Sequence, residues 1–146
     1  MSDVASMGRF VGKTHILPVR VYYEDTDVSG IVYHANYLRY MERGRSEFLR
    51  LAGIHHMVML ANDEPLAWTI RRMEIDYAKA ARLDENLEVH TRYTTMSGAR
   101  LSGAQWIKRS GIDLVTANVE AAIITMSGKP RRIPEDVRAK LAGYLD

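Results

Sequence analysis

A single long amphipathic helix pattern, followed by a long stretch of strand periodicity, limits the folds open to this 146-residue chain. In residues 36–52 apolar positions recur at steps of three or four, and charged residues occupy the other faces. Residues 66–126 alternate between apolar and polar positions, with turn sequences at 97–98 and 110–111. One more strand pattern, 15–23, precedes the helix. Strand, helix and four further strands predict an α+β fold, an antiparallel sheet packed on one helix.

The remaining segments complete a single domain, which we expect over residues 14–146 because a chain of this length suits one hydrophobic core. Residues 1–13 read as a loose N-terminal leader. A short helix is expected at about 55–62, and a closing helix at 134–145 with proline near its first turn.

Composition excludes several classes of protein. The formal net charge is only +2, so no nucleic-acid partner is expected. The absence of cysteine excludes a disulfide framework, a cysteine nucleophile and a cysteine metal site. The N-terminus lacks the apolar core of a signal peptide, and no apolar run approaches membrane-spanning length, so we expect a cytoplasmic protein without a transmembrane segment.

The region between the first strand and the helix carries a cluster of acids. Glu24, Asp25 and Asp27 end the strand pattern, Gly30 permits a tight bend, and the helix pattern begins shortly afterwards. A carboxylate before a helix N-terminus faces unpaired N–H groups and the positive end of the helix dipole. This combination suits a hydrolytic site, in which N–H donors hold a developing oxyanion. The alternative is an acidic turn that only caps the helix.

The same region resembles the signature of a known family. The order YYEDTD, Gly30, VYH, NY and a helix with E-R-x-R resembles hotdog-fold acyl-CoA thioesterases of the 4-hydroxybenzoyl-CoA type, and more narrowly their Tol-Pal-associated (YbgC-type) branch. The resemblance continues through residues 71–77 and 128–134. It implies a five-stranded antiparallel sheet wrapped around one central helix, and hydrolysis of an acyl thioester to free acid and coenzyme A.

The resemblance also assigns the catalytic groups. Asp27 matches the catalytic carboxylate, which either attacks the thioester carbonyl or deprotonates a water. An ordinary aspartate pKa of about 3.9 makes a weak base, which favours direct attack. His34 matches the position whose backbone N–H polarises the carbonyl, with its ring as a second candidate. Asn36 is a candidate helix N-cap, which leaves the identity of the donor open. Val28 and Ser29 replace small residues common there and are expected to narrow the pocket.

The substrate-binding residues are predicted around these groups. Tyr33 and Tyr37 line or pack the pocket, and Glu42 is a polar contact near the site and the competing catalytic carboxylate, because other hotdog branches place theirs on the helix. Cations suited to the phosphates of coenzyme A follow the last strand, at Lys129, Arg131 and Arg132, with Arg71 and Arg72 behind them.

The expected partners follow from the same resemblance. Acyl-CoA is the substrate, acyl-carrier-protein thioesters are a second class, and neither a metal nor another cofactor is expected; the adjacent His55 and His56 lack ligand spacing. Exposed sheet edges predict a homo-oligomer, a dimer or a dimer of dimers, with the site at the junction. A non-catalytic acyl-thioester or acyl-carrier-protein scaffold linked to envelope lipid metabolism is the alternative function, and a hydratase is a third.

Overall fold

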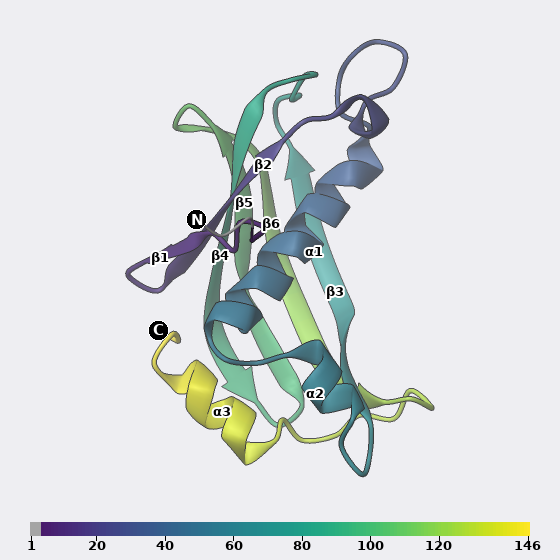
Figure 1. Cartoon of the computed structure of the whole chain (residues 1–146), viewed down its shortest axis with the longest axis vertical. Helices are drawn as coiled ribbons and strands as arrows, with labels where there is room; N and C mark the ends of the chain where they lie inside the picture. Colours follow the sequence, from purple (N-terminus) through teal and green to yellow (C-terminus); the bar gives the residue numbers. More distant parts are fainter. Residues whose placement is uncertain (1–3) are drawn as a thin grey trace.

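One antiparallel sheet and a long helix across one of its faces make up the fold (Figure 1). The computed structural model describes residues 4–146. Within them the sheet contains six strands in the order β1-β2-β4-β5-β6-β3. The strands are β1 (Arg9–Val11), β2 (Thr14–Arg20), β3 (Leu66–Tyr77), β4 (Asn86–Ser97), β5 (Arg100–Arg109) and β6 (Ile112–Thr125). The helices are η1, a 3₁₀ turn (Tyr23–Asp25), α1 (His34–Leu51), α2 (His56–Leu60) and α3 (Glu135–Ala142).

The element order agrees with the α+β prediction from the sequence, which is confirmed. Both predicted hairpin turns are present, since β4 ends at Ser97 before β5, and β5 ends at Arg109 before β6. Two details were wrong. Arg9–Val11, expected in a loose leader over residues 1–13, forms β1 and pairs antiparallel with β2, so the sheet has six strands instead of five. Residues 1–3 of that leader lie outside the described part.

The helix α1 packs against two adjoining groups of apolar residues. Its first half buries Tyr37, Tyr40 and Met41 against the sheet, and its second half buries Phe48 and Leu49. The second group also includes apolar residues of β6, α3 and the segment between them, Ile123, Ile133 and Leu141. The core therefore runs the length of α1, which fixes both ends of the helix relative to the sheet.

Gly44, midway along α1, allows the helix to approach the sheet closely. An added Cβ there would lie 2.8 Å from Val89 Cγ1 and 3.1 Å from Thr91 Oγ1, and both residues are fully buried on β4. Only glycine fits at this separation without displacement of a neighbour.

The two edges of the sheet differ in length. One edge is the three-residue β1, and the other is the twelve-residue β3, which pairs with β6 on one side only. A long edge strand presents unpaired N–H and C=O groups that favour addition of another strand. No helix in residues 4–146 combines the length and the apolar character required to span a membrane.

Candidate active site

A tight loop connects the acidic turn η1 to the start of α1. The backbone N–H of Asp27 donates to the Ile31 carbonyl at 3.0 Å, and the N–H of Gly30 donates to the Asp27 carbonyl at 3.1 Å. Gly30 adopts a φ of 80°, a conformation that favours glycine. An isolated bridge between Thr26 and Val32 closes the base of the loop. Asp27 is therefore held on a short, internally bonded loop directly before the helix.

The Asp27 carboxylate is exposed and bonded within its own loop. Its Oδ1 accepts a hydrogen bond from the Ser29 backbone N–H at 2.8 Å and a very short one from the Ser29 hydroxyl. These two bonds, the hydroxyl first, lower the pKa of Asp27. A carboxylate with a lowered pKa stays ionised at neutral pH but is a weaker base, which favours nucleophilic attack over proton abstraction.

The helix α1 begins at His34, two residues earlier than the candidate N-cap Asn36. Tyr33 occupies the N-cap position in extended conformation, and no side chain caps the helix in the described structure. The first N–H groups of a helix have no intrahelical acceptor, so the N–H groups of His34 and Ala35 remain available to a ligand. The Asn36 backbone N–H instead bonds the Tyr33 carbonyl at 2.8 Å.

One backbone oxygen ties the acidic turn to this helix end. The carbonyl of Asp25 accepts hydrogen bonds from the Tyr33 N–H at 2.9 Å and from the side-chain amide of Asn36 at 2.8 Å. Asn36 is buried, so the expectation that it caps the helix is wrong: its side chain reaches back to η1. This anchoring brings the Asp27 loop and the N-terminus of α1 to the same end of the molecule.

Tyrosine side chains surround His34 at the start of α1. The His34 ring is exposed, lies 4.6 Å from the Tyr33 ring and meets the Tyr77 ring edge-on at 6.2 Å. In residues 4–146 no hydrogen bond joins this ring to Asp27. Tyr37 is buried, its ring lies 5.8 Å from that of Tyr77, and its hydroxyl accepts a hydrogen bond from the Ala81 N–H at 2.9 Å. Tyr37 thus packs behind the site, whereas Tyr33 and His34 face its open side.

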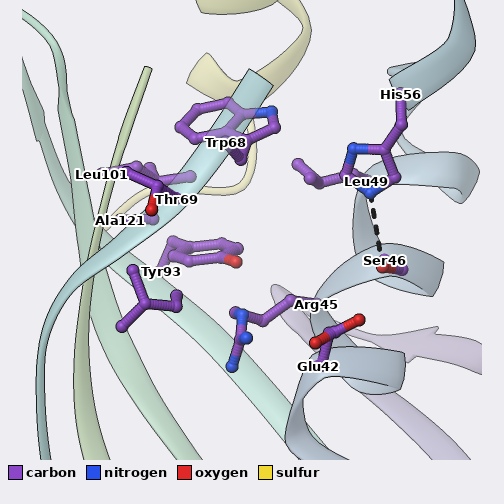
Figure 2. A pocket seen from close by; sticks show the side chains of 11 residues that line it. Glu42, Arg45, Ser46, Leu49, His56, Trp68, Thr69, Tyr93, Leu101 and Ala121 are labelled. Carbon is purple, nitrogen blue, oxygen red and sulfur yellow. Dashed lines mark hydrogen bonds between the residues drawn. The ribbon is translucent and has the colours of Figure 1, made fainter. Parts of the chain in front are cut away.

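A cavity of about 330 Å³ lies between α1 and β3, further along the helix (Figure 2). Glu42 and Arg45 of α1 line it opposite Trp68 of β3, and Tyr93 of β4 completes the wall. Asp27 and His34 are not among its lining residues. Within one chain, Glu42 is therefore separated from the acidic loop and faces this cavity instead.

The predicted phosphate-binding cations lie at the opposite end of α1 from Asp27. They follow β6, whose Thr125 pairs with Leu66 at the start of β3, whereas Tyr77 near His34 is at the other end of β3 (Figure 1). Arg131 forms an ion pair with Glu64 at 2.9 Å, and Arg132 lies 3.8 Å from Glu135. Lys129 is exposed. A single chain does not bring these cations to the catalytic candidates.

The sequence did not predict two side-chain contacts at the site, that of Ser29 with Asp27 and that of Tyr77 with His34 and Tyr37. Ser29, expected only to narrow the pocket, bonds Asp27; the spacing Asp-x-Ser is typical of a turn in which an aspartate accepts a bond two residues on, so the pattern was readable. Tyr77 reaches His34 and Tyr37 only through the fold, because it ends a strand that lies far from them in sequence.

The sheet wrapped on α1 is the hotdog fold implied by the sequence resemblance, and comparison with known proteins confirms that prediction. Residues 21–141 match the family model described as thioesterase-like superfamily, and the chain belongs to this superfamily.

Named relatives agree with the family. The chain is 40% identical over 123 residues to the acyl-CoA thioesterase YbgC of Haemophilus influenzae, an alignment that covers 84% of this chain and 90% of that protein. It is 38% identical over 126 residues to the acyl-CoA thioester hydrolase YbgC of Escherichia coli O157:H7, covering 84% and 92%. The crystal structure of a probable thioesterase from Bartonella henselae superposes with a TM-score of 0.80 at 45% identity, covering 83% and 99%. The predicted YbgC-type resemblance is confirmed.

Proposed function

We propose that this protein hydrolyses acyl-CoA thioesters to a free acid and coenzyme A, with Asp27 as the catalytic carboxylate. One observation carries the proposal: an ionised carboxylate is held directly before a helix whose first N–H groups have no capping side chain. The names of the relatives from Haemophilus influenzae and Escherichia coli support the acyl-CoA class.

The proposed reaction uses the Asp27 carboxylate as the nucleophile and the N–H groups at the start of α1 as the oxyanion donors. An Asp27 oxygen attacks the thioester carbonyl carbon, and the N–H groups of His34 and Ala35 stabilise the negative charge on the carbonyl oxygen. The C–S bond breaks, the coenzyme A thiolate leaves and takes up a proton, and an anhydride joins Asp27 to the acyl group. Water then cleaves this anhydride, which releases the acid and restores Asp27. The lowered pKa of Asp27 supports this route over water activation.

The proposal includes a dimer formed through the β3 edges. Antiparallel pairing of two twelve-residue β3 strands would place the Leu66 end of one chain beside the Tyr77 end of its partner. The cations after β6 of one subunit would then approach the Asp27 loop of the other, where the coenzyme A phosphates require positive charge. In this dimer Lys129, Arg131 and Arg132 could bind the coenzyme A phosphates beside the Asp27 loop of the other subunit, which they are too distant to do within one chain.

The test compares wild type with Asp27→Asn on a panel of short, long and aromatic acyl-CoAs and on acyl-carrier-protein thioesters. Asp27→Asn preserves shape but removes the nucleophile, so kcat should fall by about a hundredfold or more, with a much smaller change in affinity. Retention of more than a third of wild-type kcat would refute the assignment and favour Glu42. Single-turnover hydrolysis in ¹⁸O water separates the routes, because the label enters the Asp27 carboxylate only through the anhydride. A wild-type protein that binds every thioester and turns over none would favour the scaffold alternative.

A further inference from the structure

Arg45 is a partly buried cation that faces the cavity between α1 and β3 with little compensation from the protein (Figure 2). Its one hydrogen bond among the described residues runs from Nη1 to the side-chain oxygen of Gln105, at 3.0 Å. No carboxylate forms an ion pair with it in that part of the chain. A guanidinium has five N–H donors, so most of those of Arg45 have no acceptor among residues 4–146.

Gln105 holds this guanidinium in a fixed orientation. The Gln105 side chain is 1% exposed, and its amide nitrogen donates to the Met41 carbonyl and to Thr91 Oγ1, both at 2.9 Å. With both partners of the nitrogen in place, the amide cannot turn, and its oxygen must face Arg45. The protein therefore positions Arg45 with a neutral acceptor, which leaves the positive charge unneutralised.

The surroundings of Arg45 favour an incoming anion. Burial lowers the pKa of Arg45, although arginine remains charged in proteins. The electrostatic effects of Tyr93 and then of the exposed Glu42 act in the opposite direction, and neither group is bonded to the guanidinium in the described structure. Burial raises the pKa of Tyr93 to about 12, so its phenol stays protonated and can donate a hydrogen bond. In Figure 2 the phenol oxygen of Tyr93 points toward α1. The indole N–H of Trp68 is buried in the same wall without an acceptor in the described structure.

We propose that the cavity binds the far end of the acyl group and that Arg45 selects acyl groups that end in a carboxylate. Charge-assisted, bidentate hydrogen bonds make arginine the residue best suited to a carboxylate. Leu49, Leu101 and Ala121 supply apolar wall for the methylene groups. This inference rests on the proposed thioesterase function and names its substrate class, the CoA thioesters of dicarboxylic acids.

The distance along α1 sets the length of the acyl group. His34 and Arg45 are separated by about 16 Å along the helix axis at 1.5 Å per residue. Side chains on a helix point back toward its N-terminus, so the Arg45 guanidinium lies closer to the start of α1 than the Arg45 backbone does. A spacer of several methylene groups is required between the thioester and the carboxylate, which favours suberyl-CoA over succinyl-CoA.

The decisive experiment measures kcat/KM for suberyl-CoA and for octanoyl-CoA, which have the same number of carbons and differ only in the terminal carboxylate. We expect wild type to prefer suberyl-CoA by about tenfold or more, equivalent to one good charge-assisted interaction. Arg45→Met, of similar length but uncharged, should remove this preference. The matched control Arg39→Met, at an exposed position of the same helix, should retain both the preference and the activity. A wild type without the preference, or an Arg45→Met variant that keeps it, overturns the proposal.

Binding of amides, in which the amide replaces the thioester, separates this proposal from the proposed function. If wild type hydrolyses neither thioester, calorimetry with the monoamide of suberic acid, which keeps one carboxylate, and with octanamide, which has none, still decides: Arg45-dependent binding of the monoamide supports the cavity assignment, and equal or absent binding overturns it. If circular dichroism shows that Arg45→Met does not fold, wild type is titrated with this monoamide and with the neutral diamide of suberic acid. Equal affinity for the two compounds would overturn the proposal, and tighter binding of the monoamide would support it.

Discussion

Gly44→Ala should destabilise the protein, although alanine is the better helix former. The added Cβ would lie 2.8 Å from Val89 Cγ1, 3.1 Å from Thr91 Oγ1 and 3.3 Å from Gln105 Nε2. Val89 and Thr91 are fully buried, and the Gln105 amide is held by two hydrogen bonds, so none of the three can yield without breaking other contacts.

The magnitude follows from two opposing terms. Overpacking of a close-packed core costs about 1–3 kcal/mol, and the upper end applies because all three neighbours are fixed. Replacing glycine by alanine inside a helix returns about 1 kcal/mol. The net loss is about 2 kcal/mol, which lowers Tm by roughly 4–8 °C for a chain of this size.

The measurement is thermal unfolding by circular dichroism, at one protein concentration for all variants. Gly143→Ala is the matched control, because Gly143 has a φ of −72° and an added Cβ there would meet no atom within 4 Å, so the substitution should be neutral or slightly stabilising. A Gly44→Ala variant with a Tm equal to or above wild type would show that α1 does not require its close approach to the sheet.

Three further outcomes test the site. Ser29→Ala removes the main cause of the lowered Asp27 pKa. Because the proposed reaction requires the ionised form, the acidic limb of the kcat/KM profile should move to higher pH, and an unmoved limb would contradict this. His34→Gln should retain substantial kcat, since the backbone N–H survives; a loss as large as that of Asp27→Asn in a folded variant would assign the reaction to the imidazole. Dilution monitored by sedimentation should lower activity per chain as the β3-paired oligomer dissociates, and a fully active monomer would exclude a shared site.

The sequence predicted the elements well because their periodicity is local. The predicted end of the central helix is correct within one residue, but the predicted start is two residues late. Asparagine is a residue type typical of the N-cap position, whereas the Asn36 side chain in fact donates to the Asp25 carbonyl. The sequence did not predict β1, because a three-residue strand carries almost no periodic signal and exists only through pairing with β2.

The candidate site was predictable where its residues are neighbours in sequence. Asp27 and His34 lie on one loop and one helix end, and both were identified from that segment. The role proposed for Arg45 was not predictable, since its hydrogen-bond partner Gln105 is sixty residues away and only the fold brings the two together. Contacts across a sheet depend on register, which no single segment encodes.

The Asp25 carbonyl accepts two hydrogen bonds at once, and this affects which substitutions the site can tolerate. A main-chain oxygen cannot be removed by substitution, and its two bonds do not use the Asp25 carboxylate, which instead accepts a hydrogen bond from the Tyr22 N–H at 2.8 Å at the start of η1. Of the two donors to this oxygen, the Asn36 amide is the one that belongs to a side chain, so a substitution of Asn36 would remove one of the two bonds. Substitutions elsewhere around the site that keep Asn36 therefore leave the acidic turn and the start of α1 joined.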